Sequence, residues 1–330
     1  MAEPKNGLRR RFPFRFEKMW LSHPNLFSSV KDRWNVHLDS SAMFWVAKNL
    51  RHVKERVKKW NREVFGDIFV QKFAIQEELV LIQGKYQHEG YVNDNFAKES
   101  EALSKYHNII AREETFWRQR SRALWLKDGD KNTRLFHIST LKHRTANRIG
   151  HMMNNGRIID NEDEISRVVV EFFVDLLKKD TLLDPKAQNM LADTIPKILS
   201  ESQNHNLIAI PSKEEIKSVF FSFDGSKAPC PDGFLMFFFQ HFWDVVGEDV
   251  SNVVKEFFGA RSLLKELNAT FIVLIPKKQG VDSLHAFRPI ILCNSFYKII
   301  SKVLTSRLLG VLPLLISPQQ IWLFTRKTNS

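Results

Sequence analysis

Two apolar seams at helical spacing, both between residues 40 and 122, constrain the fold of this chain more than any other feature. The first seam advances by steps of three or four residues through Val46, Leu50, Val53, Val57, Trp60, Val64 and Ile68. After a break at Asn93-Asp94-Asn95, the second seam comprises Phe96, Leu103, Tyr106 and Ile110. Apolar residues at this spacing are typical of helices that bury one face. We therefore predict a long helical hairpin over residues 37–122, acting either as a plain spacer or as an arm that contacts nucleic acid.

The charge balance indicates a polyanionic partner. The 330 residues carry a net charge of +12, which favours nucleic acid over a membrane surface. Residues 1–60 contain 14 Lys and Arg against 5 Asp and Glu, a local net charge of +9. For any single basic block, a solvated helix face is the alternative. We expect RNA or DNA to bind weakly and mainly by charge, and the sequence does not define an oligomeric state.

Cysteine content and hydropathy indicate in which compartment the protein is expected and whether it spans a membrane. Cys230 and Cys293 lie far apart and form no Cys-x-x-Cys pair, so we expect neither a disulfide framework nor a Cys-rich zinc site. We therefore expect the protein in a reducing, intracellular compartment. The sequence does not distinguish the nucleus from the cytoplasm. The most apolar stretch, 290–316, is interrupted by three cations, so no membrane span is predicted.

Residues 116–151 interleave cations with aromatic side chains around Asp128-Gly129-Asp130, which we interpret as a turn rather than a metal site. Cations next to aromatic rings suit phosphate contact combined with base stacking, although such rings are more often part of a core. The candidate nucleic-acid-binding residues are Arg118, Arg122, Lys127, Lys131, Arg134, Lys142, Arg144 and Arg148.

Local signals predict several further elements. Residues 152–159 resemble two short strands about an Asn-Gly turn, and Glu162 to Leu177 has the pattern of an amphipathic helix. Ser212 followed by Glu215 indicates a capping box, in which each side chain binds the other residue's amide. Further on, the apolar run 271–275 ends in Pro-Lys-Lys, and a loop, Phe-Arg-Pro-Ile and an amphipathic helix follow.

Three segments together resemble the reverse transcriptases of LINE-type (non-LTR) retrotransposons, of the kind abundant in plants. They are Trp125–His137 (WLKDGDKNTRLFH), Lys227–Phe234 (KAPCPDGF) and Asn268–Gln320, which contains FIVLIPKK and FRPI. Cys230 replaces the usual Gly of the second segment, and it is strained if that position needs a positive φ. Residues 12–36 resemble the end of the endonuclease that precedes the polymerase in these elements.

The resemblance implies a division of the chain into four parts. They are an endonuclease remnant (1–36), a helical hairpin linker (37–122), a basic pre-polymerase linker (123–205) and an incomplete fingers region without a complete palm (206–330). The implied fold is mainly α with a few short β strands. Arg288 of FRPI is expected to approach the triphosphate of the incoming nucleotide, with Lys277 adding positive potential. Pairing of Arg288 with a carboxylate, and an exposed turn lysine at 277, are the alternatives.

The family's activity is RNA-templated DNA synthesis, which needs Mg²⁺ ions held by clustered carboxylates. In the family these carboxylates follow FRPI and include an Asp-Asp pair, and no Asp-Asp pair occurs in this sequence. After Ser317-Pro318-Gln319-Gln320 the sequence departs from the family pattern, which suggests a frameshift, a wrong splice or a truncation. We therefore expect no catalytic residue, no metal ligand and no cofactor in this chain. A non-enzymatic nucleic-acid-binding module and a non-functional pseudogene product are the alternatives.

Overall fold

The computed structural model describes residues 13–34, 41–89, 93–121, 133–154, 156–178, 190, 196–225, 230–278 and 280–316. Helices dominate these residues, and the described strands form two antiparallel two-stranded sheets. The prediction of a mainly α fold with a few short strands is therefore confirmed. None of the described helices is long and apolar enough to cross a membrane.

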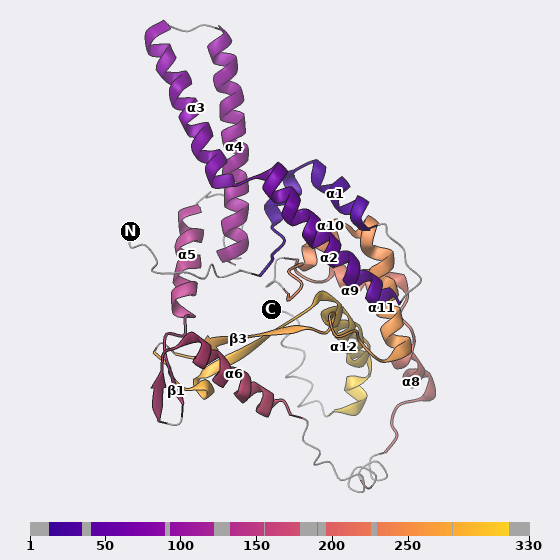
Figure 1. Ribbon diagram of the computed structural model, residues 1–330. Helices are drawn as coiled ribbons and strands as arrows, with labels where there is room; N and C mark the ends of the chain where they lie inside the picture. The colour runs from indigo at the N-terminus through magenta and orange to yellow at the C-terminus, as the bar shows by residue number, and fades with distance from the viewer. Residues whose placement is uncertain are drawn as a thin grey trace.

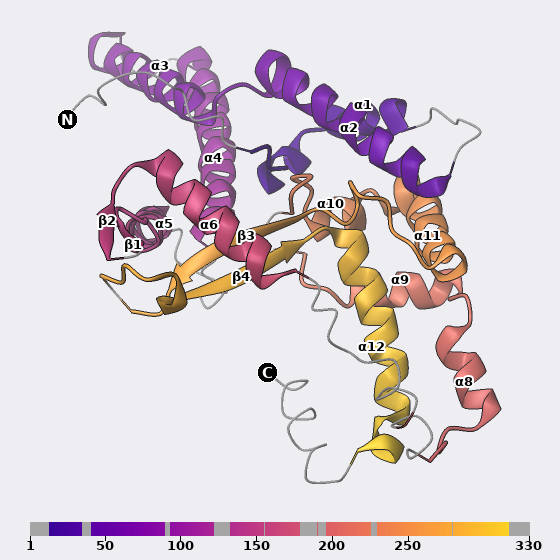
Figure 2. The same ribbon diagram turned by 60° about the horizontal axis from the view of Figure 1, so that its bottom comes forward.

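The main body is a layered helical core seen on one side of Figures 1 and 2. Its helices are α1 (Asn25–Trp34), α2 (Ala42–Trp60), α8 (Glu201–Ile208), α9 (Lys213–Phe221), α10 (Met236–His241), α11 (Trp243–Ala260) and α12 (Ser295–Leu315). A short 3₁₀ turn, Lys18–Ser22, precedes α1. One continuous hydrophobic cluster joins α1 and α2 to α9–α12.

The N-terminal helices are fastened to α11 by specific hydrogen bonds as well as by apolar packing. The indole Nε1 of Trp34 donates to Asp249 Oδ2 at 2.6 Å, and the amide of Met43 donates to Glu256 Oε2 at 3.0 Å. Residues from the predicted segments 1–36, 37–122 and 206–330 thus share one core.

A helical hairpin lies within the predicted range 37–122, but its first helix is not the one that carries most of the first seam. The seam Val46–Trp60 belongs to α2 and is buried against the main body. A π-helical turn, Asn61–Phe65, and Gly66 at φ +74° then redirect the chain. The projecting arm consists of α3 (Ile68–Glu89) packed on α4 (Asn93–Ser121), as Figure 1 shows.

The prediction that Phe96, Leu103, Tyr106 and Ile110 form the buried face of the second helix is also wrong in part. Phe96 and Leu103 are exposed, whereas Ala102 and Ile109 are buried. Large apolar residues at helical spacing were therefore a poor guide here, because the close approach of α3 and α4 uses a small residue at Ala102. The ion pair between Lys72 Nζ and Glu113 Oε2, at 2.6 Å, helps to hold the two helices together.

A smaller lobe lies at the other end of the molecule (Figure 2). It contains β1 (Met152–Asn154), β2 (Arg157–Ile159), α6 (Glu162–Leu176) and the far end of the hairpin of β3 (Thr270–Pro276) and β4 (Phe287–Cys293). Both the Asn-Gly hairpin and the amphipathic helix are confirmed as predicted, with Gly156 at φ +79°. Met152, Ile159, Ile165 and Phe287 form the core of this small lobe. Helix α5 (Thr133–Ala146) connects it to α4.

The loop after residue 229 is held against the N-terminal segment. The amide of Phe16 donates to the carbonyl of Gly233 at 2.9 Å, and Gly233 has φ +86°. A Cβ at this glycine would lie 2.2 Å from the carbonyl oxygen of Phe14. Cys230 does not adopt a positive φ, so the strain expected there is absent, and its side chain is buried instead.

Candidate nucleic-acid interface

Helix α5 and the residues after it carry the most exposed part of the predicted basic site. The stretch from 131 to 159 contains no Asp or Glu. Arg134, Lys142 and Arg148 are exposed and form no ion pair within the described part of the chain. Such cations keep their full charge available to a phosphate backbone.

The structure places the remaining predicted cations as follows. Arg118 lies exposed in the last turn of α4, and Arg144 lies exposed in the last turn of α5. Arg122, Lys127 and Lys131 fall outside the described residues. Five of the eight predicted cations can therefore be located, all on α4, on α5 or directly after α5.

The aromatic half of the prediction is only partly compatible with base stacking. Phe136 is only 2% exposed, so its ring is buried and not available to stack on a base. Trp117 packs its ring on His137, with centroids 4.4 Å apart, and on Phe116. Exposed aliphatic side chains, rather than rings, accompany the cations of α5: Leu135, Ile138 and Leu141.

A second basic surface, on α2, was not among the predicted site residues. Arg51, Lys54 and Lys58 follow one another at i, i+3 and i+7 and so share one face of the helix. Lys54 and Lys58 both lie over the ring of Phe14, at 5.4 and 5.6 Å from its centroid. The pKa of Lys54 is lowered by burial and, secondarily, by the charge of Lys58. The local charge of +9 in residues 1–60 was the signal that could have revealed this surface.

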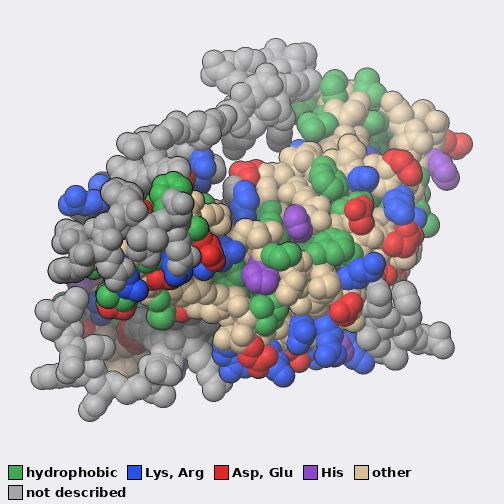
Figure 3. All heavy atoms as spheres, turned by 90° about the horizontal axis from the view of Figure 1, so that it is seen from above, with side chains coloured by type: hydrophobic (Ala, Val, Ile, Leu, Met, Phe, Trp, Pro, Cys, Tyr) green, Lys and Arg blue, Asp and Glu red, His purple; other side chains and the backbone are tan. Residues whose placement is uncertain are grey.

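The two basic surfaces belong to opposite parts of the molecule, since α2 lies in the main body and α5 leads into the small lobe (Figure 1). Seen from above, Lys and Arg side chains gather along one border of the described surface (Figure 3).

Arg288 lies on the open face of the β3–β4 hairpin. It pairs in register with Ile275, and the next pair on the same face is Val273 with Ile290. Val273 is 39% and Ile290 40% exposed, so the Arg288 side chain adjoins a partly exposed apolar strip. Arg288 is exposed and makes no ion pair within the described residues. The alternative of a carboxylate partner is thus unsupported, and nucleotide binding stays a prediction.

Two other cations of the C-terminal region, Lys277 and Arg307, have partners within the protein, and Lys277 is exposed as its alternative foresaw. Lys277 Nζ donates to the carbonyl of His285 at 2.7 Å. Arg307 forms two 2.8 Å bonds to the carboxylate of Glu215, and its guanidinium also contacts the Phe258 ring. Arg307 is therefore a structural residue. The predicted capping box is half formed, because Ser212 Oγ accepts the Glu215 amide while the Glu215 carboxylate turns to Arg307.

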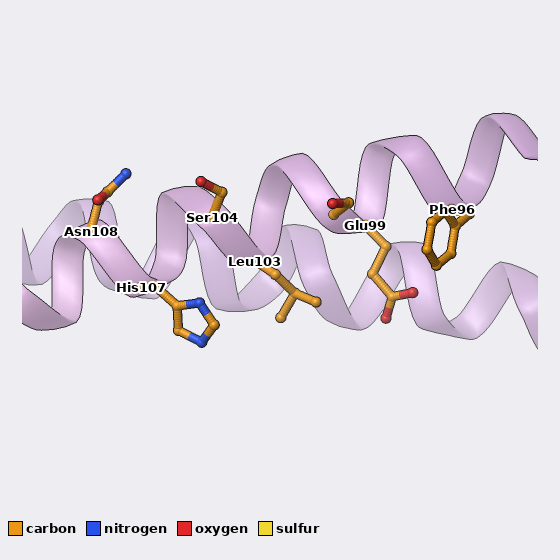
Figure 4. Close-up of a pocket in the computed structure, with 7 residues that line it drawn as sticks. Phe96, Glu99, Leu103, Ser104, His107 and Asn108 are labelled. Atoms are coloured by element: carbon orange, nitrogen blue, oxygen red, sulfur yellow. The ribbon is translucent and has the colours of Figure 1, made fainter.

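A hollow of about 420 Å³ on the arm does not resemble a nucleic-acid site. Its lining residues all come from α4 and follow one side of that helix (Figure 4). They include exposed Phe96 and Leu103 and the carboxylate of Glu99, which accepts a bond from Gln83, but no Lys or Arg. In the described part of the chain, no three His, Cys, Asp or Glu residues form a group that could hold a metal ion.

The fold and these surfaces describe a mainly helical protein with two exposed cationic faces. No protein-family model matches it. The chain is similar to the transposon TX1 uncharacterized 149 kDa protein of Xenopus laevis, with 25% identity over 321 residues. The match covers 95% of this chain but only 24% of that protein, so the chain spans about a quarter of its relative's length. The similarity supports a retrotransposon-related origin.

Proposed function

We propose that the chain corresponds to the linker and fingers region of a LINE-type reverse transcriptase, and that it binds single-stranded RNA or DNA mainly by charge. The similarity to a transposon protein along 95% of the chain supports the first part. The motifs KAPCPDGF and FIVLIPKK…FRPI support the assignment to a reverse transcriptase.

The observation that carries the binding proposal is the group of exposed cations in the acid-free stretch of sequence that follows α4. Arg134, Lys142 and Arg148 are exposed and unpaired among the described residues, within a stretch of 29 residues (131–159) that lacks Asp and Glu. Side chains of this kind release counterions from a phosphate backbone when they bind it. Because exposed aliphatic groups rather than rings accompany them, we expect the contacts of this α5 surface to show little preference for base sequence.

Templated DNA synthesis is not expected from these 330 residues alone. Metal-dependent phosphoryl transfer requires clustered carboxylates, and the sequence lacks the Asp-Asp pair that the family uses. Primer extension with Mg²⁺ or Mn²⁺ that survives stringent purification is the result that contradicts this part of the proposal.

The binding proposal is tested by fluorescence anisotropy with a labelled 20-nucleotide RNA at low salt. The test variant carries Arg134→Ala, Lys142→Ala and Arg148→Ala. The matched control carries Lys105→Ala, Lys178→Ala and Lys213→Ala, which removes the same charge from residues already paired with Glu101, Asp175 and Glu248. We expect the test variant to bind the RNA at least about tenfold more weakly than the control. Equal affinities would show that the α5 surface is not the binding site.

A further inference from the structure

A cavity of about 240 Å³ lies between α2, the loop 230–234 and the N-terminus of α12. Its apolar walls include Leu50 and Leu267, and its polar lining consists of Arg51, Lys54, Asp232, Glu266 and Asn294. Sites for drug-sized ligands are larger, at roughly 300–1,000 Å³, so this cavity suits a fragment the size of a nucleobase.

The polar lining holds two buried hydrogen-bond acceptors without a donor. Asn294 is 1% exposed; its Nδ2 donates to the carbonyl of Glu266 at 2.9 Å, while its Oδ1 has no partner among the described residues. Asp232 Oδ1 accepts the amide of Phe234 at 2.9 Å, and its buried Oδ2 is likewise unpartnered. Leaving such groups unsatisfied costs about 1–3 kcal/mol each, so a ligand that brings hydrogen-bond donors to these two oxygens would recover that cost.

The charges around the cavity limit what that ligand can be. Arg51 and Lys54 lie on the α2 side, and Lys298 also acts on the Asp232 carboxylate. These three cations outnumber the carboxylates of Asp232 and Glu266, so the surroundings of the cavity carry a net positive charge, which disfavours a metal ion or a guanidinium group. A neutral group with hydrogen-bond donors, attached to an anion, meets both requirements. A nucleotide has this combination, with the phosphate toward Arg51 and Lys54 and away from Glu266.

Among the standard bases, guanine fits the two acceptors best. Its Watson–Crick edge presents adjacent N1–H and N2–H₂ donors, whereas adenine and cytosine place a ring acceptor beside their amino group, and uracil has a single N–H between two carbonyls. Unstacked bases are read on this edge in single-stranded recognition.

We propose that the cavity between α2, the loop 230–234 and Asn294 binds a guanine nucleotide, with the base edge on Asp232 and Asn294 and the phosphate on Arg51 and Lys54. The inference deepens the proposed function and rests on it, since it gives one guanine of a bound strand a specific pocket. Burial of Asp232 raises the pKa of its carboxyl to about 6, which is still below neutral pH, so at pH 7 Oδ2 can accept one donor of the base edge while Oδ1 keeps the Phe234 amide.

The test is isothermal titration of the full chain with guanosine 5′-monophosphate, inosine 5′-monophosphate and adenosine 5′-monophosphate. We expect saturable binding of the guanine nucleotide. The inosine nucleotide, which lacks the 2-amino group, should bind about tenfold more weakly, and the adenine nucleotide more weakly still. Because this series needs no variant, it remains valid whether or not a variant folds.

Variants then place the site. Asp232→Asn should weaken binding of the guanine nucleotide at least about tenfold. Lys54→Met should lower the affinity for the nucleotide more than the affinity for free guanosine, which has no phosphate. Lys59→Ala, an exposed position on the same helix outside the cavity, should change neither. No saturable binding, or equal binding of all three nucleotides, overturns the inference.

Failure of this inference and failure of the proposed function give different results. If RNA binds through the α5 cations but the guanine nucleotide does not bind, only the pocket assignment is wrong. If the guanine nucleotide binds in an Asp232-dependent manner but RNA does not bind, the pocket stands and the proposed function is wrong.

Discussion

The buried carboxylate of Asp232 predicts a stabilising substitution whose size depends on pH. Burial raises the pKa of this carboxyl to about 6, against about 3.9 for an aspartate in an unfolded chain. The folded protein therefore retains a proton that the unfolded chain has already released. The free energy of unfolding falls as the pH rises from about 4 to above 6, because the folded protein must then hold the charged carboxylate away from water, whereas the unfolded chain exposes it.

The magnitude follows from the shift. About two pKa units at 1.36 kcal/mol each amount to roughly 3 kcal/mol of stability that is present below pH 4 and lost by pH 7. In Asp232→Asn the remaining carbonyl oxygen can still accept the Phe234 amide, and no charge is buried. We expect the variant to match the wild type near pH 4 and to exceed it by up to about 3 kcal/mol at pH 7.

The assay is urea unfolding at several pH values, followed by tryptophan fluorescence. Trp20, Trp60 and Trp243 lie in the same core as the loop that carries Asp232. Other carboxyl groups titrate equally in both proteins and cancel in the difference. A stability difference that is independent of pH, or a variant less stable than the wild type at pH 7, refutes the reasoning.

Three further perturbations test other parts of the structure. Arg307→Met should lower the free energy of unfolding by about 2–3 kcal/mol, because it leaves the Glu215 carboxylate without its two bonds; Lys302→Met, exposed on the same helix, is the control for urea unfolding. Gly233→Ala should destabilise the chain by more than about 1 kcal/mol through its positive φ and the clash with Phe14, whereas Gly310→Ala, in an open helical position, should raise the thermal midpoint. Val273→Thr with Ile290→Thr should reduce self-association in sedimentation experiments with little loss of stability, because both side chains are about 40% exposed on an uncovered strand pair; unchanged self-association would show that another surface drives it.

Elements set by local sequence could be predicted, and their partners could not. The Asn-Gly turn defines β1 and β2 within eight residues, and Ser212 caps α9 through an amide three positions away. The seam of α2 correctly marked a buried face. It did not reveal that the face packs on α1 and α11 rather than on a hairpin partner, because spacing carries no information about what covers a helix.

In the candidate sites, too, features of the local sequence could be predicted and long-range partners could not. Exposed cations of α5 were predictable from charge and the absence of acids. The structural role of Arg307 was not, since its partner Glu215 lies 92 residues away. The cavity was equally hidden, because Lys54, Asp232 and Asn294 come from three distant segments and meet only when the N-terminal helices pack on the C-terminal region.

The central claim, that this chain binds single-stranded nucleic acid by charge through α5, is tested most directly by the salt dependence of RNA binding. Each phosphate neutralised on a single strand contributes about −0.7 to the slope of log affinity against log salt. Removal of Arg134, Lys142 and Arg148 should therefore make the slope shallower by about 2, while the matched removal of Lys105, Lys178 and Lys213 should leave it nearly unchanged. Identical slopes for the two variants, or a wild-type affinity that does not respond to salt, would contradict the account.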